Sequence, residues 1–299
     1  MDILNIRNVV KTYESKVAVD DVSLNIPQGI IFGMLGPNGA GKTSLIRIIT
    51  TITRPDSGKI LFDNDPLIEK HTEQMGYMPE ERGLYKKMKV GEQLLYLARL
   101  KGLSKQEAES TIAHWFDKFD IKDWYNKKVM DLSKGMQQKV QFIATVMHRP
   151  KLIILDEPFS GLDPINAKLI ENEIIRMRDE GTSIIFSTHR MEQVEEICDK
   201  IVLINQGKNV LEGDVNEIKN TYKENLYNIR YEGNINVHFE QFGEITHKND
   251  NSITIKCDSS QKANDLLKWM IQNGALINSF KEILPTINDI FIRKVEGNI

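Results

Sequence analysis

The sequence predicts an α/β protein with a parallel sheet, followed by a small α+β domain. Short apolar runs, which are typical of buried parallel strands, alternate with amphipathic helical stretches between residues 30 and 205. After about residue 222 this alternation ends, and strand-like and helix-like segments follow in another order. The chain has 299 residues, enough for two ordinary domains, so we place a boundary within residues 214–224.

The N-terminal part begins with two alternating segments, 3–9 and 17–26, which predict strands separated by a polar turn at 10–14. An apolar run at 30–35 predicts a buried strand, and helical spacing begins at Ser44. The chain therefore enters its parallel sheet through a strand–turn–helix unit.

A long helical insertion is expected over residues 67–148, because apolar residues recur at helical spacing in 90–100 and 106–119. The core then continues with predicted strands at 151–155, 182–187 and 200–205, and predicted helices at 167–180 and 190–198. The last domain has predicted strands near 226–231, 252–256 and 275–283, and predicted helices at 261–273 and 286–295.

The composition narrows the class of protein. Hydrophobic residues make up 40% and charged residues 27% of the chain, which is typical of a soluble globular protein. A net charge of −3 argues against a dedicated nucleic-acid-binding protein, which is usually basic. We find no signal peptide and no apolar run long enough for a membrane span. Cys198 and Cys257 lack metal-ligand spacing, and we expect reduced, buried thiols.

The turn after the strand at 30–35 carries a nucleotide-binding motif. Glycines there let successive backbone N–H groups wrap around phosphates at the positive end of a helix. Lys42 would reach the β- and γ-phosphates, and Thr43 would ligate Mg²⁺. An ordinary glycine turn is the alternative, but the flanking strand and helix favour the phosphate-binding loop. The residues of the loop are Gly36, Pro37, Asn38, Gly39, Ala40, Gly41, Lys42 and Thr43, followed by Ser44.

Two adjacent carboxylates, Asp156 and Glu157, follow the apolar run at 152–155. Ligands of open α/β sheets bind at the carboxyl ends of the strands, where these side chains are expected. Asp156 can hold Mg²⁺ there, and Glu157 can orient or deprotonate an attacking water. A solvated acidic turn is the alternative, and the phosphate-binding loop upstream disfavours it.

Two further segments place polar groups near this edge. Ser133 is expected to cap a helix running to about residue 148, with Gly135 allowing close backbone approach. Taken alone, this is more simply an ordinary capped helix. His189 ends the predicted strand at 182–187, and a single histidine in such a place is more often structural than catalytic.

Together these motifs resemble those of ATP-binding-cassette (ABC) ATPases over about residues 1–213. The resemblance implies a P-loop NTPase core with an antiparallel β subdomain and a helical subdomain at about 67–148. Residues 222–299 would form a C-terminal α+β accessory domain. ATP and Mg²⁺ would be the cofactors.

The resemblance also implies a role for each motif. Asp156 would be the Walker B aspartate, Glu157 the catalytic glutamate, and His189 the switch histidine that contacts the γ-phosphate. Tyr13 would stack on adenine, and Asp163 would belong to the D-loop. Lys42 would contribute to catalysis as well as to ATP binding.

In ABC ATPases two cassettes pair head to tail, and each signature motif closes over the ATP of the other. Here that motif would include Ser133, Lys134 and Gly135. The implied partners are a second ATPase subunit, identical or different, and an integral membrane permease, with no nucleic acid. The chain would then lie at the cytoplasmic face of the cell membrane.

Two positions depart from the family pattern. Glu80 stands where the Q-loop glutamine is expected, and it would still contact nucleotide and Mg²⁺. In the signature motif, Lys134 replaces a glycine and Met136 a glutamine. Both departures, with the run Glu80-Glu81-Arg82-Gly83-Leu84-Tyr85, are similar to NatA-like bacterial exporter ATPases. That branch carries a C-terminal domain and includes sodium and drug or peptide exporters.

We therefore expect the ATPase subunit of a bacterial exporter with a separate permease. One alternative is a soluble ABC ATPase acting on ribosomes or nucleic acid, which would usually have two cassettes or a coiled coil. Another is a sensing subunit in which residues 222–299 bind a ligand. The apolar stripe of that domain is more simply core, and it comprises Leu266, Leu267, Met270 and Ile271.

Overall fold

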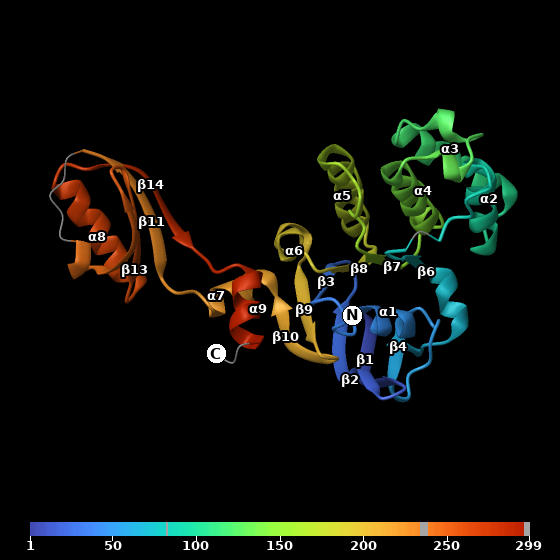
Figure 1. Ribbon diagram of the computed structural model, residues 1–299, viewed down its shortest axis with the longest axis horizontal. Coiled ribbons are helices and arrows are strands. Elements are labelled where there is room, and N and C mark those ends of the chain that lie inside the picture. Colours follow the sequence, from blue (N-terminus) through green and yellow to red (C-terminus); the bar gives the residue numbers. More distant parts are fainter. Residues whose placement is uncertain (82, 234–238, 296–299) are drawn as a thin grey trace. The chain divides into compact units, whose positions relative to one another are not determined.

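The computed structural model describes residues 1–81, 83–233 and 239–295. The chain divides into two compact units, Met1–Gly213 and Asp214–Ile299 (Figure 1). Arg82, part of the motif that suggested NatA-like ATPases, lies outside the described residues. Within the described part, no helix is both long and apolar enough to cross a membrane.

A six-stranded sheet forms the centre of the first unit. Parallel pairing joins β6 to β7, β7 to β8, β8 to β3 and β3 to β9. All residues of β3, β7 and β8 are buried, as expected for apolar parallel strands covered on both faces. In order across the sheet the strands are β10 (Lys208–Asp214), β9 (Lys200–Asn205), β3 (Ile31–Leu35), β8 (Ser183–Thr188), β7 (Leu152–Asp156) and β6 (Met75–Met78).

A helix follows each of the strands β3, β7 and β8. The phosphate-binding loop Gly36–Thr43, or P-loop, leads into α1 (Lys42–Ile49), whose apolar residues are buried. Asp163 caps α5 (Pro164–Asp179) by accepting hydrogen bonds from the N–H groups of Ile165 and Asn166, and Pro164 is its first residue. The shorter helix α6 (Met191–Ile197) follows β8 and contacts both β3 and β8.

A second, antiparallel sheet has the order β2-β1-β4-β5. Its strands are β1 (Asp2–Tyr13), β2 (Lys16–Pro27), β4 (Ser57–Phe62) and β5 (Asp65–Pro66). The predicted polar turn at 10–14 was wrong in extent, because β1 continues to Tyr13, which pairs with Lys16 of β2. Side chains of both sheets and of α1 form one apolar cluster, which includes Ile6, Phe32 and Leu45.

The helical insertion expected over residues 67–148 was wrong in extent, because its first part contains a strand. Strand β6 lies inside that range and extends the central sheet by pairing with β7. Helices dominate only after it, and aromatic side chains such as Trp115 and Phe142 pack between them. The elements of the range are η1 (Glu69–Gln74), α2 (Val90–Leu100), α3 (Lys105–Lys118), η2 (Lys122–Trp124), η3 (Val129–Asp131) and α4 (Lys134–Val146).

The second unit contains a four-stranded antiparallel sheet of order β12-β13-β11-β14. Helix α8 packs on one face of this sheet, where its Leu266 joins Ile229 of β11 and Ile255 of β13 in one core. Ile271, expected in this core, is 59% exposed. The elements are α7 (Val215–Thr221), β11 (Leu226–Glu232), η4 (Phe239–Gln241), β12 (Gly243–Asn249), β13 (Ser252–Cys257), α8 (Ser260–Gln272), β14 (Leu276–Ile283) and α9 (Ile287–Val295).

Candidate active site at the carboxyl edge of the central sheet

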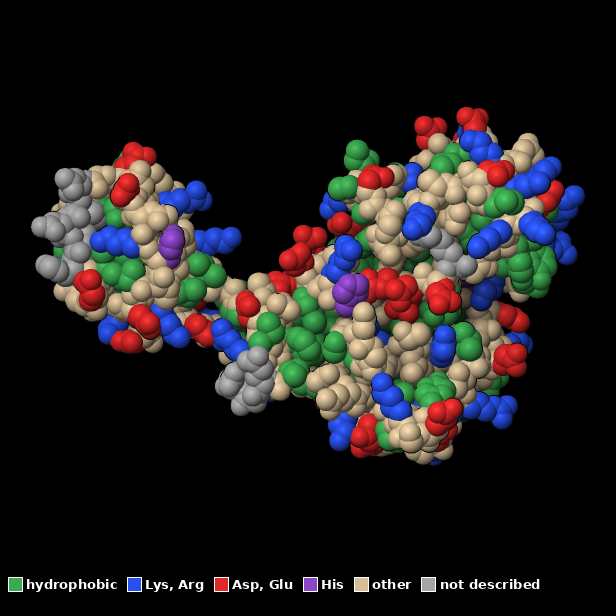
Figure 2. Space-filling model, viewed as in Figure 1, with side chains coloured by type: hydrophobic (Ala, Val, Ile, Leu, Met, Phe, Trp, Pro, Cys, Tyr) green, Lys and Arg blue, Asp and Glu red, His purple; other side chains and the backbone are tan. Residues whose placement is uncertain are grey.

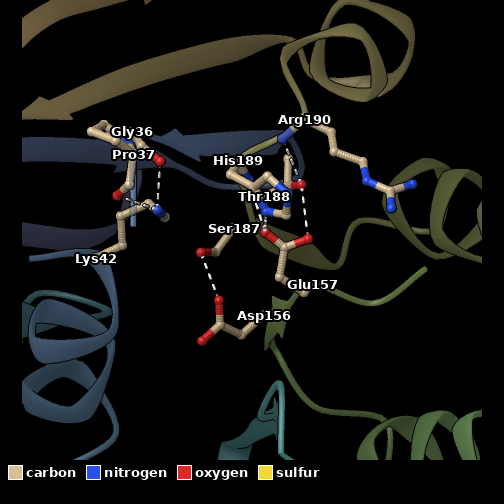
Figure 3. Close-up of polar contacts among 9 residues, drawn as sticks. All are labelled: Gly36, Pro37, Lys42, Asp156, Glu157, Ser187, Thr188, His189 and Arg190. Carbon is tan, nitrogen blue, oxygen red and sulfur yellow. Dashed lines mark hydrogen bonds and ion pairs between the residues drawn. The ribbon is translucent and has the colours of Figure 1, made fainter. Parts of the chain in front are cut away.

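The strand order brings three chain segments together at one edge of the sheet. Strand β8 lies between β3 and β7, and all three run in parallel. The P-loop leaves β3, the carboxylate pair ends β7, and His189 follows β8. Figure 3 shows Lys42, Asp156, Glu157 and His189 around this edge.

The P-loop backbone requires glycine at two points. Gly36 has φ 145° and Gly41 has φ 112°, and a Cβ would lie 2.1 Å from the Ile204 carbonyl oxygen and 2.2 Å from the Ala18 carbonyl oxygen, respectively. Lys42 folds back over the loop, and its Nζ donates to the carbonyl oxygens of Gly36 at 2.6 Å and Pro37 at 3.1 Å (Figure 3). The loop thus holds a buried ammonium group where phosphates would bind.

Burial lowers the pKa of Lys42 below its ordinary value. Attraction by Asp156, Glu157 and Glu80 opposes that shift, in that order. Glu80, from the loop after β6, therefore lies close enough to act on the same ammonium group. The structure brings these four predicted site residues into one electrostatic cluster.

Asp156 is 3% exposed at the end of β7. The Ser187 hydroxyl donates a hydrogen bond of 2.8 Å to Asp156 Oδ1 from the neighbouring strand. Burial is the main cause that raises the pKa of Asp156, and the hydrogen bond from Ser187 is the main opposing one. Ser187 thus fixes one carboxylate oxygen of Asp156.

Glu157 accepts three hydrogen bonds from the residues that end β8. They come from the His189 N–H at 2.8 Å, the Thr188 hydroxyl at 3.1 Å and the His189 ring nitrogen Nδ1 at 2.6 Å (Figure 3). The backbone of Glu157 has φ 51°, and its N–H donates to the Ser187 carbonyl oxygen. This left-handed turn directs the carboxylate toward β8 instead of along β7.

The signature residues form a second group around the start of α4. The Ser133 hydroxyl accepts from the Met136 N–H at 3.3 Å, as predicted for a helix cap. Lys134 is the exposed first residue of the helix. A Cβ on Gly135 would lie 3.6 Å from the Gly161 carbonyl oxygen, so this helix start packs beside the loop that leads to Asp163.

The remaining predicted residues lie in α1 and at the β1–β2 hairpin. Thr43 and Ser44 are in the first turn of α1. Tyr13 is 40% exposed at the tip of the β1–β2 hairpin, and Lys11 Nζ lies 5.5 Å from the centre of its ring. Lys11 also pairs with Asp56 at 2.7 Å.

Ser187 and Thr188 have no predicted role, yet both hydroxyls contribute to the site. Each bonds a carboxylate 31 residues earlier in the chain, across the junction of β7 and β8. The available signal was two hydroxyl residues directly before the predicted histidine at a strand end. Only the order of the strands shows which carboxylates they reach.

Comparisons with known proteins identify the family. A family model for ABC transporters matches residues 19–160, and one for the C-terminal domain of DrrA1-3-like ATP-binding proteins matches residues 213–295. The chain is 42% identical over 295 residues to the uncharacterized ABC transporter ATP-binding protein YhaQ of Bacillus subtilis, covering 98% of each chain. The chain belongs to the ABC transporter ATP-binding proteins.

Two other relatives of this ABC protein are informative. It is 36% identical to the ABC transporter ATP-binding protein NatA of Bacillus subtilis over 200 residues, covering 66% of this chain and 81% of NatA. The structure of cbiO1 from Clostridium perfringens matches with a TM-score of 0.65 and 28% identity, covering 73% of this chain and 90% of cbiO1. The chain is thus an ABC ATPase that binds ATP as part of a transport system.

Proposed function

We propose that this ABC ATPase drives a bacterial exporter, hydrolysing ATP at the cytoplasmic face of the cell membrane and moving a separate permease. The observation that carries the catalytic part is the meeting of Lys42, Asp156 and Glu157 at one sheet edge. The similarity to NatA and to the C-terminal domain of DrrA1-3-like proteins supports placing it in the branch suggested by the sequence. Sodium and drugs or peptides are the cargo classes that this branch suggests.

Glu157 is the general base in this proposal. Its carboxylate is held by three donors, so it is fixed at the edge where the γ-phosphate would end. A fixed carboxylate can accept a proton from water without reorganising. His189 contacts Oε1 of Glu157 through its backbone N–H and its ring nitrogen Nδ1, so it orients the base and offers its ring to the γ-phosphate.

Lys42 changes partners when ATP binds. Its ammonium group now bonds two P-loop carbonyls, and phosphate oxygens are stronger acceptors for a cation. We infer that the β- and γ-phosphates replace these carbonyls. Backbone N–H groups of residues 38–44 bind the phosphates at the start of α1.

The oxygen-rich residues here fit Mg²⁺, which prefers hydroxyl, carboxylate and phosphate ligands. Thr43, Asp156 and Glu80 would hold the ion together with the nucleotide. Asp156 already has one oxygen bonded to Ser187, which leaves the other free to face the ion. When bound, Mg²⁺ would neutralise charge on the phosphates.

A second ATPase subunit completes the site in this proposal. Ser133, Lys134 and Gly135 lie at a helix start, where backbone N–H groups favour an anion. They pack beside the loop before Asp163 and would close over the ATP of the partner. Exposed Ile165, directly after this loop, suits the same interface.

The permease would bind a groove of about 260 Å³ between β6, α2 and α4. Leu84, Leu97 and Leu100 line it, and Figure 2 shows hydrophobic side chains on the surface near α2. Gln141 lies in the same groove, is 5% exposed, and has Oε1 without a hydrogen-bond partner among the described residues. A short apolar helix with one polar donor would fill it.

Copurification from detergent-solubilised membranes tests the proposal. The wild-type chain should bring down a polytopic membrane protein, and Leu100→Asp should lose that protein while still binding ATP. Lys105→Asp, at an exposed position of α3, serves as the matched control that keeps the partner. If the wild-type chain captures no membrane protein, or captures ribosomes or nucleic acid instead, the exporter proposal is wrong.

A further inference from the structure

The tip of the β1–β2 hairpin carries a second cation toward the P-loop. Tyr13 and Lys16 are the last cross-strand pair, and only Glu14 and Ser15 turn the chain between them. Directly opposed residues of an antiparallel pair point to the same face of the sheet. The ring of Tyr13 and the ammonium group of Lys16 are therefore presented on one face.

That face reaches the phosphate-binding loop. Lys16 Nζ lies 4.0 Å from the position that a Cβ would occupy on Gly39, in the middle of the P-loop. Among the described residues no carboxylate pairs with Lys16, whereas the neighbouring Lys11 is neutralised by Asp56. Lys16 is thus an unneutralised, exposed cation at the rim of the loop.

Backbone bonds hold this rim in place. The N–H of Gly207, in the turn between β9 and β10, donates to the Ala40 carbonyl oxygen at 2.8 Å. The carbonyl oxygen of Gly207 accepts from the Asp20 N–H at 2.9 Å. The turn therefore joins the P-loop to β2, and the spacing between Lys16 and the loop is set by ordered backbone.

We propose that Lys16 is a second phosphate-binding cation of this ATPase, acting from the rim of the P-loop while Lys42 acts from inside it. The inference rests on the binding of ATP described above and concerns how the charge of the phosphates is balanced. A nucleotide with its base on Tyr13 and its phosphates in the loop passes Lys16. The contribution of Lys16 to nucleotide affinity grows with the number of phosphates, whereas that of Tyr13 does not.

Calorimetric titration of the full chain with ATP, ADP and AMP tests this. Lys16→Met should weaken ATP binding about threefold to tenfold at low salt, with less effect for ADP and least for AMP. Lys16→Arg should restore most of the affinity. Tyr13→Ala should weaken all three nucleotides by the same factor, and Lys105→Met, which removes a distant lysine, should change none.

Higher salt should shrink the difference between wild type and Lys16→Met, because an exposed charge is screened. An ATP affinity of Lys16→Met equal to wild type at low salt would overturn the inference and leave the ATPase assignment intact. An equal loss for all three nucleotides would also overturn it, since the residue would then act on the base or ribose. Failure of the wild-type chain to bind ATP would instead refute the proposed function.

Discussion

The two units use their sheets in different ways. In the first unit, parallel strands end together and place buried Lys42 and Asp156 at one edge. In the second, antiparallel β11 and β13 alternate an apolar face with a polar one, and the core contains no charged side chain among the described residues. Burying charge disfavours folding unless the groups are compensated. The first unit therefore retains such groups for chemistry, while the core of the second needs none.

The largest effect is expected when the cationic side chain of Lys42, in the first unit, is removed, and Arg293 in the second unit provides the comparison. Lys42→Ala should weaken ATP binding by about a hundredfold or more, because charge-assisted bonds to phosphate are lost. Arg293→Ala, which removes the ion pair with Glu224 in the second unit, should leave ATP affinity unchanged. Equilibrium titration measures both affinities, and an equal loss in the two variants would contradict a nucleotide-binding role confined to the first unit.

Core truncation should act on each unit alone. Ile154→Ala in β7 and Ile255→Ala in β13 each empty a fully buried site and should cost about 2–5 kcal/mol. Hydrogen exchange should show faster local opening in the mutated unit and unchanged protection in the other. Loss of protection in both units from either variant would show that they unfold together.

A half-buried histidine, His148, makes the first unit sensitive to pH. Burial, together with repulsion by Lys101, lowers the pKa of His148 to about 4, and its Nε2 lies 3.1 Å from the Met75 carbonyl oxygen. The unfolded chain binds the extra proton near pH 6.5, so stability is complete above that value and falls toward pH 4.

We expect His148 to account for about 2 kcal/mol of that loss. His148→Gln should remove this contribution to the loss of stability in acid. The unfolding free energy of the variant should therefore fall less than that of wild type between pH 6.5 and 4. Denaturant titrations across this range measure it. Parallel curves for the two proteins would show that His148 is not the group responsible.

Glu80→Gln should have the smallest effect. Exposed Glu80 adds negative charge beside Asp156 and Glu157, so neutralising it should tighten Mg²⁺-free ATP binding by about threefold. Titration with ATP in excess chelator gives the value, and Glu81→Gln provides a neighbouring control. Weaker binding of ATP by Glu80→Gln would mean that the carboxylate contributes through a contact instead of through its charge.

The sequence predicted the strands that end at the site because each motif is contiguous. Gly36–Thr43 and the pair Asp156–Glu157 are recognised from a few neighbouring residues. Bonds such as Ser187 to Asp156 could not be predicted, because they depend on which strands are neighbours. The position of Lys16 over Gly39 likewise depends on the turn that joins two separate sheets.

Missed elements had weak local patterns. Strand β6, Met75–Met78, is four residues long and contains Gly76, so it gives no clear alternation within a mainly helical stretch. Strand β12, Gly243–Asn249, is mostly polar because it is an edge strand, and only Gly243 and Ile245 are partly buried. Both are strands because a neighbouring strand offers hydrogen bonds, which no local pattern records.

The role of Glu157 as general base is tested by measuring two properties of Glu157→Gln: its rate of ATP hydrolysis and its molecular mass with ATP. The glutamine keeps the shape of the side chain but cannot accept the proton, so hydrolysis should fall about a hundredfold to ten-thousandfold. ATP binding should persist, and sedimentation should show a stable dimer with ATP. Unchanged turnover in Glu157→Gln would show that this carboxylate is not the general base of the reaction.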